Sequence, residues 1–197
     1  MNYRSLPIIY LQKQVVFPYC NVSFRSTSRT LSGLSQGDRV VALPVRTVLD
    51  GLFPRGRLAT LSEVVEIQRD DDAWNVQLKG VARVEVRRVK KFSMVEYDAI
   101  DETERAGHER LREDLRKKSQ ELIFLINVNE SDKLIHLLNF LVNLPQLSDF
   151  VSNYFILKFP RRYEIFVERD VELRARKLLA VLDELIVDLK VKRERER

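Results

Sequence analysis

A chain of 197 residues that is 45% hydrophobic and 32% charged has the composition of an ordinary globular protein. The single cysteine, Cys20, excludes a disulfide framework within the chain, and no apolar run approaches the roughly 18 residues that a membrane-spanning helix needs. The first residues, Met1-Asn2-Tyr3-Arg4, lack the apolar core of a secretion signal, so we expect a cytoplasmic protein.

The net charge of +5 is carried by the first half of the chain. Residues 1–100 contain 15 basic and 10 acidic residues, whereas residues 101–197 contain 19 of each. A basic half can attract nucleic acid or acidic peptides. Here acidic residues lie between the basic ones, and no strand motif combines aromatic with basic residues. We therefore interpret these charges as solvated surface and keep RNA binding as an alternative hypothesis.

Short strands with turn residues between them are typical of residues 1–100. Val40-Val41-Ala42-Leu43 predicts a buried strand that Pro44 ends. In Trp74–Leu78 the large apolar residues alternate with polar ones, which places them on one face of a strand. Asp70-Asp71-Asp72 disfavours regular structure and predicts a hairpin turn between Val64–Gln68 and Trp74–Leu78. Together these features predict a small, partly closed antiparallel barrel.

Residues 101–197 carry helical periodicity instead. The last predicted helix spans about residues 170–192, where apolar residues recur every third or fourth position and Asp170 can cap the first turn. Four shorter helices precede it: one from Leu111 to Ile126, one that begins at Ser131 or Asp132 and is ended by Pro145, one from about Leu147 to Leu157, and one with Pro160 in its first turn.

The segment Gly51–Leu58 has the Gly-x-x-x-x-Gly spacing of a phosphate-binding loop but lacks its chemistry. Arg57 stands in place of the lysine, Leu58 has no hydroxyl for a magnesium ion, and Pro54 removes one N–H group from the cradle. The residues that follow predict a strand, whereas a phosphate-binding loop leads into a helix. We therefore predict that no nucleotide binds here.

Candidate metal ligands and nucleophiles are equally sparse. The two histidines, His108 and His136, lie far from Cys20 in the sequence and show no zinc-ligand spacing. We expect His108 to be solvated, His136 to be packed or partly exposed, and Cys20 to lack a catalytic base. Ser119 and Lys118 are adjacent, so on a helix they point in different directions and form no catalytic pair. The sequence thus predicts no catalytic residues, no metal, no cofactor and no enzyme activity.

Three aromatic residues remain as candidates for binding a peptide. Tyr19, Phe24 and Phe53 are expected at strand ends or in turns, where they either close the barrel or anchor an unfolded polypeptide. An open strand edge can bind a peptide as well. Both routes accept many sequences, because backbone hydrogen bonds and apolar area carry the contact.

Several short motifs occur in an order that resembles one protein family. Val15-Val16-Phe17-Pro18 precedes Leu52-Phe53 with Gly56-Arg57-Leu58-Ala59, then Gly80-Val81-Ala82-Arg83-Val84, and the second half continues with Leu147–Ser152, Leu157-Lys158-Phe159 and Asp170-Val171-Glu172. Over nearly the whole chain this order resembles the N-terminal, substrate-binding domain of Lon proteases. Pro18-Tyr19 departs from the family's frequent Pro-Gly.

The resemblance implies an α+β fold, with a β-rich, PUA-like barrel over residues 1–100 and an α-helical bundle with a long terminal helix over residues 101–197. It also implies a non-catalytic protein that recognises unfolded or damaged polypeptides or a protein partner, such as a protease or chaperone. Two alternatives stay open. One is an N-terminal fragment of a full ATP-dependent Lon serine protease, and the other is an RNA-binding PUA-like module.

Overall fold

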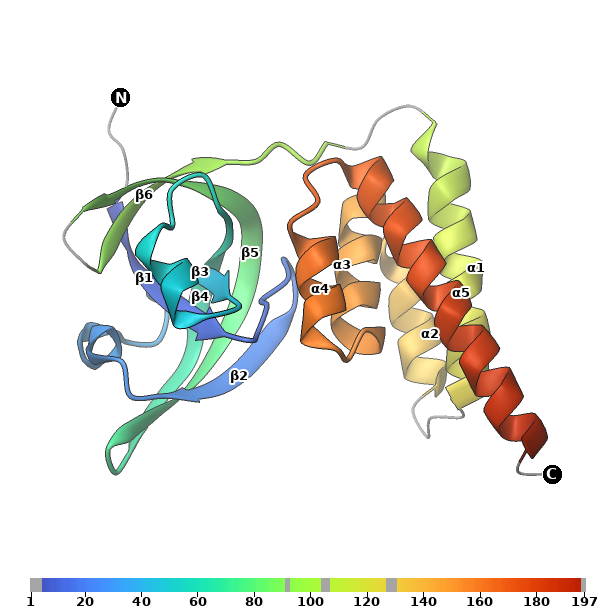
Figure 1. Ribbon diagram of the computed structural model, residues 1–197, viewed down its shortest axis with the longest axis horizontal. Helices are drawn as coiled ribbons and strands as arrows, with labels where there is room; N and C mark the ends of the chain where they lie inside the picture. The colour runs from blue at the N-terminus through green and yellow to red at the C-terminus, as the bar shows by residue number, and fades with distance from the viewer. Residues whose placement is uncertain (1–4, 91–92, 104–106, 127–130, 196–197) are drawn as a thin grey trace. The chain divides into compact units, whose positions relative to one another are not determined.

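The computed structural model describes residues 5–90, 93–103, 107–126 and 131–195. The chain forms two compact units, each assembled from discontinuous segments. The first unit comprises Met1–Asp101 and Ile156–Val167, and the second comprises Glu102–Phe155 and Glu168–Arg197. The segment Ile156–Val167, drawn in orange in Figure 1, therefore belongs to the same unit as the strands, whereas its sequence predicted a place in the helical half.

The first unit is built around six strands. They are β1 (Ser5–Gln12), β2 (Asn21–Ser26), β3 (Arg39–Val45), β4 (Leu58–Asp70), β5 (Ala73–Lys90) and β6 (Met94–Ala99). The short 3-10 helix η1 (Arg29–Gly33) follows β2, and η2 (Val48–Leu52) follows β3. Helix α4 (Phe159–Phe166) completes the unit.

The strands lie in the order β2-β5-β4-β3-β1-β6, and β6 also pairs with β5, so that five strands close into a ring. The long strand β5 pairs with β2 through its first half and with β6 through its second half. The described pairs are antiparallel except for β1 and β3, which are parallel. The prediction of an antiparallel barrel is wrong at this pair. A long connection that includes β2 and η1 separates β1 from β3, and such a crossover allows the chain to return in the same direction.

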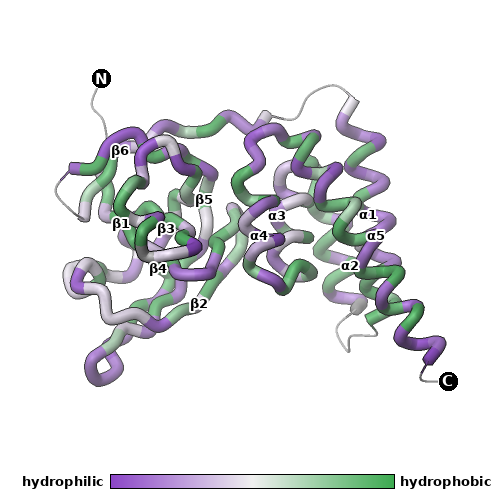
Figure 2. Tube along the Cα trace, in the orientation of Figure 1, coloured by the Kyte–Doolittle hydropathy of each residue, from purple (hydrophilic) through white to green (hydrophobic). Residues whose placement is uncertain are grey.

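The predicted hairpin between β4 and β5 is confirmed. Asp70 pairs with Ala73, and the turn residue Asp71 adopts the left-handed conformation, with φ of +52°. Aspartate tolerates this conformation better than most residues do. Figure 2 shows the turn as a hydrophilic tip.

Pro44 lies inside β3, so the prediction that it ends the strand is wrong. Pro44 is paired with Leu11 of β1, whereas the pairing of β3 with β4 covers only Arg39–Ala42. At Pro44 the strand thus has a neighbouring strand on one side only. The missing N–H of a proline is tolerated at such a position.

Buried apolar side chains fill both faces of β1. Ile8 belongs to one cluster of buried residues and Ile9 to another, because successive side chains of a strand point in opposite directions. A third cluster contains Phe17 and Phe166 of α4, whose rings lie edge to face with centroids 5.8 Å apart. The buried Arg83 places its guanidinium carbon 4.9 Å from the centre of the Phe166 ring. These contacts explain why α4 belongs to the first unit.

The second unit consists of α1 (His108–Ile126), α2 (Ser131–Phe140), α3 (Leu144–Phe155) and α5 (Val171–Arg195). The predicted α+β fold with a long terminal helix is confirmed. The 25 residues of α5 span about 38 Å at 1.5 Å per residue. The predicted cap is also confirmed, because the N–H of Leu173 donates to Asp170 Oδ1 at 2.9 Å.

Two predictions about helix ends are wrong. Pro145 does not end the second helix but lies in the first turn of α3, where its missing N–H costs no helical hydrogen bond. His108 is buried and not solvated. It is the first residue of α1 and lies on the buried side of that helix, together with Leu111 one turn later.

Candidate functional site

Titratable and metal-binding groups form no centre in the described part of the chain. No three His, Cys, Asp or Glu side chains there are grouped as a metal ion would require. Cys20 is buried in the cluster of Phe17. His136 is exposed on α2, with its ring edge-on to Phe140 and 4.5 Å between ring centroids.

Whether a helix can span a membrane depends on its length and polarity. No helix in the described ranges is both long and apolar enough to cross a membrane.

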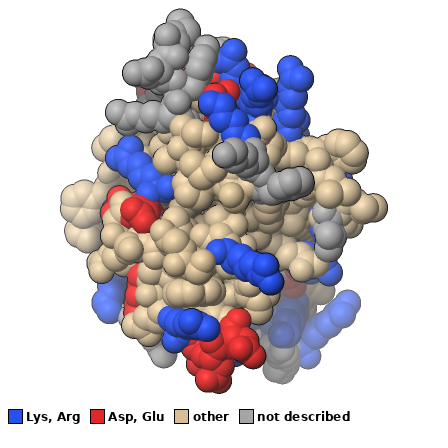
Figure 3. All heavy atoms as spheres, turned by 90° about the vertical axis from the view of Figure 1, so that its left-hand side faces the viewer, with Lys and Arg blue, Asp and Glu red and all other residues tan. Residues whose placement is uncertain are grey.

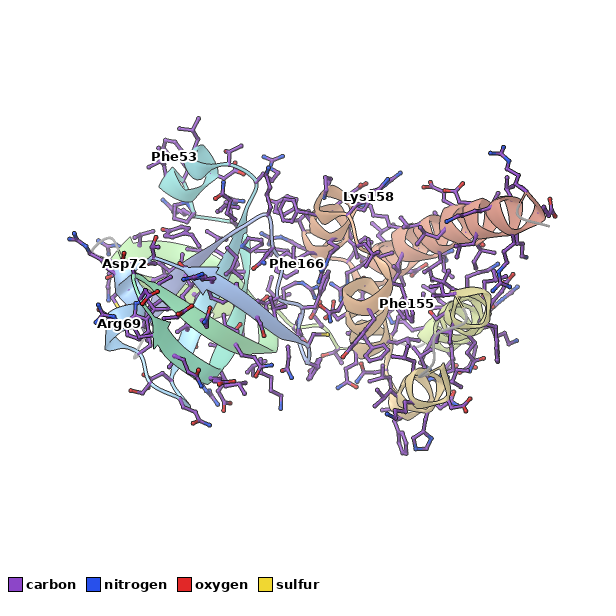
Figure 4. All side chains as sticks on the ribbon, turned by 90° about the horizontal axis from the view of Figure 1, so that it is seen from below. Phe53, Arg69, Asp72, Phe155, Lys158 and Phe166 are labelled. Atoms are coloured by element: carbon purple, nitrogen blue, oxygen red, sulfur yellow. The ribbon has the colours of Figure 1, made fainter. Side chains whose placement is uncertain are left out.

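The segment with the spacing of a phosphate-binding loop forms an apolar projection. Leu49 and Leu52 of η2 and Phe53 after it are 70%, 65% and 79% exposed, and we call these three residues the apolar loop. The strand predicted after the segment is confirmed, since β4 begins at Leu58. Figure 4 shows Phe53 beside η2, away from the strands. Large apolar side chains exposed this close together are typical of a binding surface.

Asp50 fixes the conformation of the apolar loop. The N–H of Asp50 donates to Thr47 Oγ1, while Asp50 Oδ2 accepts from the backbone N–H groups of Thr47 at 3.3 Å and Arg46 at 2.9 Å. The Arg46 side chain donates to the same oxygen at 3.2 Å. This side-chain hydrogen bond, with the backbone donors, holds the pKa of Asp50 below its ordinary value. The carboxylate is therefore ionised at neutral pH and the reciprocal cap persists.

Arg57 holds the apolar loop from the side of β4. Its guanidinium donates to the backbone oxygens of Asp50 and Pro44, the latter at 3.0 Å, and to the hydroxyl of Tyr163 at 3.1 Å. Gly56 makes the turn before it, with φ of +75°. Arg57, which stands in place of the lysine of a phosphate-binding loop, is thus a structural clamp. Hydrogen bonds within the same unit thus support the conformation of the apolar loop, and such preorganisation lowers the entropic cost of binding.

Tyr10 connects the apolar loop with a groove on the same unit. A Cβ atom on Gly51 would lie 3.4 Å from Cδ1 of Tyr10, so η2 lies directly against this ring. Partial burial raises the pKa of Tyr10. Tyr10 also lines a groove of about 670 Å³, which is within the range of about 300–1,000 Å³ typical of ligand sites. The groove is bordered by Tyr10–Gln12 of β1, by Phe24–Thr27 at the end of β2, and by Asp72-Ala73 at the β4–β5 turn.

The structure separates the three predicted binding residues. Phe53 belongs to the apolar loop, and Phe24 lines the groove while packing against the core. These two positions are linked through Tyr10. Tyr19 is 58% exposed on the connection between β1 and β2, and the residues that line the groove do not include it. A role in binding stays a prediction for all three.

Tyr19 owes its position to Gly80. The N–H of Tyr19 donates to the backbone oxygen of Gly80 at 2.9 Å. A Cβ atom on Gly80 would lie 2.2 Å from the backbone oxygen of Phe17, so only glycine permits this approach. Tyr19 itself has φ of +63°, a left-handed conformation that favours glycine. The structure thus gives a physical reason for glycine at position 80, and it shows that the backbone at Tyr19 would suit a glycine.

Reasoning from the sequence missed Leu49, Leu52 and Tyr10. A signal was available for the two leucines. Thr47 and Asp50 have the spacing of a capping box, which predicts the start of a helix at this point. A helix this short has little surface to pack against the core, so its apolar residues can stay exposed. Tyr10 gave no signal. It lies in an apolar run in which nothing distinguishes the partly exposed residue from its buried neighbours.

Known proteins similar to this chain share one description. The family model of the ATP-dependent protease La (Lon) substrate-binding domain matches residues 5–184. The N-terminal domain of the Lon protease of the Mycobacterium avium complex has a TM-score of 0.72 at 15% identity, covering 91% of this chain and 98% of that one. A Lon N-terminal domain protein from Xanthomonas campestris has a TM-score of 0.53 at 18% identity, covering 90% and 98%. No curated protein matches the chain. The solved structures show the fold, and the model match over most of the chain shows the family.

Proposed function

Because the chain belongs to the family of the substrate-binding domain of ATP-dependent protease La (Lon), we propose that it binds unfolded or damaged polypeptides and catalyses no reaction itself. The observation that carries this proposal is the apolar loop, exposed on a segment that Asp50 and Arg57 hold in place. Unfolded polypeptides offer the apolar side chains that folded proteins bury. A surface of this kind binds polypeptides because their apolar side chains are exposed, and it does not require a particular sequence.

The size of the apolar loop favours weak binding. Burying one leucine or phenylalanine contributes roughly 1.5–3 kcal/mol. Association costs about 4–15 kcal/mol in lost translational and rotational freedom. Three such side chains therefore hold a polypeptide only loosely by themselves. Loose contact with many sequences fits a substrate class that is defined by exposure of apolar residues.

The proposal extends to the scaffold and to the cellular setting. The ring of strands acts as a PUA-like barrel that presents the apolar loop, and the protein works in the cytoplasm, where its single cysteine, Cys20, stays reduced. A protease or chaperone partner, or the ATPase and protease modules of a longer Lon chain, would act on the polypeptide that this unit delivers.

The test replaces the apolar loop by serines, as L49S/L52S/F53S. The matched control is L137S/F140S, which removes two exposed apolar residues from α2. The probe is a fluorescent, permanently unfolded protein, such as reduced and carboxymethylated lysozyme, followed by anisotropy. We expect the loop variant to bind at least roughly tenfold more weakly and the control to bind within about twofold of the unmodified chain. Equal affinity of the loop variant and the unmodified chain would reject the proposal.

The same titration addresses the RNA alternative. Figure 3 shows one face of the first unit, where several lysine and arginine side chains gather near the upper rim, the others are scattered, and acidic side chains gather at the lower edge. Binding of single-stranded RNA through phosphates weakens with salt by a log–log slope of about −0.7 per phosphate. Binding of the unfolded protein through apolar side chains should change little between two salt concentrations. RNA binding that is tighter than protein binding, with the steep slope, would replace our proposal by the nucleic-acid one.

A further inference from the structure

The groove beside Tyr10 lies along the edges of strands and not on their faces. Successive residues border it, namely Phe24–Thr27 of the β2 segment and Tyr10–Gln12 of β1. Alternate side chains of a strand point to opposite faces, so a cavity on one face contacts every second residue only. A cavity that contacts successive residues lies against the backbone edge. The groove therefore runs beside the edges of β1 and β2.

Both of these edges are open within the described residues. β2 is the terminal strand of the sheet and pairs with β5 alone. On one side, β1 pairs with β3 along Ile8–Gln12. On its other side, β1 pairs with β6 only along Ser5–Pro7. One further hydrogen bond on that side runs from the N–H of Ile8 to the backbone oxygen of Ser93, just before β6. Beyond Ile8 this second edge of β1 faces no strand. Open edges present N–H and C=O groups that can pair with another chain.

The position between the two edges continues the line of β6. This strand bridges the second half of β5 and the first residues of β1. The groove lies between β2, which covers the first half of β5, and the remainder of β1. We infer that the groove binds an extended segment of the polypeptide substrate, which adds a strand to the edge of β2. This inference rests on the proposed function and specifies the conformation in which the substrate is held.

The charges of the groove favour a neutral polypeptide as its occupant. Arg25 and Asp72 are the charged residues among those that line it, and their signs cancel. Arg25 is also paired with Asp70 at 3.2 Å. Such a lining is complementary to uncharged backbone amides and offers a polyanion no net attraction. The four residues Phe24–Thr27 span about 13 Å, so the groove pairs with about four residues of substrate.

Tyr10 makes the groove and the apolar loop one continuous surface. The ring of Tyr10 lies against Gly51 of η2, and Tyr10 is also one of the residues that line the groove. A substrate that holds apolar side chains next to a neutral, extended stretch contacts both parts at once. The apolar loop then supplies contact area, and the edge of β2 supplies backbone hydrogen bonds.

The first experiment uses capped, neutral peptides long enough to span β2, each with a phenylalanine at one end. Two derivatives carry N-methyl groups on alternate residues, offset from each other by one residue. In a strand, alternate N–H groups point to opposite edges, so one derivative loses the N–H groups that face β2 and the other keeps them. We expect one derivative to bind about tenfold more weakly than the parent and the other to bind within about twofold. Equal binding of both derivatives and the parent would overturn strand addition and leave the proposed function standing.

The second experiment follows backbone amide exchange by NMR in the complex with the parent peptide. Strand addition predicts new protection at alternate residues of Phe24–Thr27, which line the groove. Protection confined to residues 48–53 would overturn the inference, although binding through the apolar loop would persist. The L49S/L52S/F53S variant separates the two proposals further. This variant should bind all the peptides more weakly, but the two N-methylated peptides should still differ in affinity. If the variant binds both N-methylated peptides equally weakly, the edge of β2 makes no separate contribution.

Discussion

Arg174 Nη1 lies 2.6 Å from Glu102 Oε1, and the whole arginine side chain is buried. Arg174 Nη1 also donates to the backbone oxygen of Glu168 at 3.1 Å. Glu102 and Glu168 are the first residues of the two segments through which the chain enters the second unit from the first. One buried side chain thus fixes two distant points of entry at the start of α5.

Removal of this arginine should destabilise the second unit strongly. Arg174→Met removes the buried guanidinium that lies 2.6 Å from the largely buried Glu102 carboxylate, and we expect the free energy of unfolding to fall by about 3 kcal/mol. Urea denaturation followed by helical circular dichroism measures the change. The double variant Arg174→Met with Glu102→Leu should recover part of the loss. The control is Lys177→Ala, which removes a partly exposed pair with Glu168 and should change stability by less than about 1 kcal/mol.

A methyl group at position 80 should disrupt the first unit. The Cβ atom of Gly80→Ala would meet the backbone oxygen of Phe17 at 2.2 Å, and a backbone atom cannot move aside as a side chain can. We expect a loss of at least about 2 kcal/mol in the free energy of unfolding. Gly33→Ala is the matched control, since a Cβ atom there meets nothing within 4 Å, and it should be neutral or stabilising by up to about 1 kcal/mol. Equal thermal stability of the two variants would contradict this role of Gly80.

Tyr19 allows binding and stability to be tested at one position. Its left-handed backbone costs about 1–2 kcal/mol for a residue with a side chain, and glycine removes that cost. Because glycine also gives the unfolded chain about 0.5–1 kcal/mol of extra entropy, Tyr19→Gly should be neutral or slightly stabilising in a melting experiment. If the exposed ring binds substrate, the same variant binds unfolded protein more weakly. Tyr19→Asn, which also tolerates this conformation, should behave alike in both measurements.

The apolar loop should depend on pH through Asp50. The hydrogen bond from the Arg46 side chain and the backbone donors lower the pKa of Asp50 in the folded protein. A group with a lowered folded pKa stabilises the fold fully above its unfolded value of about 3.9 and loses this contribution as pH falls through the folded value. The loop should therefore keep its structure at neutral and mildly acidic pH and loosen below about pH 4. NMR titration of the Asp50 carboxyl measures the pKa, and Arg46→Ala should raise it toward the ordinary value.

The sequence contained enough local information for the helices and for the main hairpin. Apolar spacing predicted α1 and α5, and the aspartates at 70–72 marked the turn that Asp70 and Ala73 close. Both signals depend on residues close together in the chain. The local sequence therefore predicted the type of each element better than it predicted which other elements pack beside it.

Features set by distant contacts were beyond the sequence. The parallel pairing of β1 with β3 depends on how a long connection returns, and Pro44 is accommodated because β4 pairs with another part of β3. His108 is buried in the folded chain, although its charged neighbours in the sequence predicted a solvated position. In the candidate site, Phe53 was predicted from its type and place in a turn, but the contact between Gly51 and Tyr10 joins residues 41 positions apart and left no local pattern.

The interleaving of the two units has a consequence for dissection of the protein. The chain leaves the first unit after Asp101, returns at Ile156 and departs again after Val167. A truncation that keeps only residues 1–101 would lose Phe166 and expose the rings and guanidinium that it covers, around Phe17 and Arg83. A protease that cuts once near residue 101 would likewise leave α4 attached to the other fragment. The units are separable only by excising residues 156–167 and rejoining them to the strands.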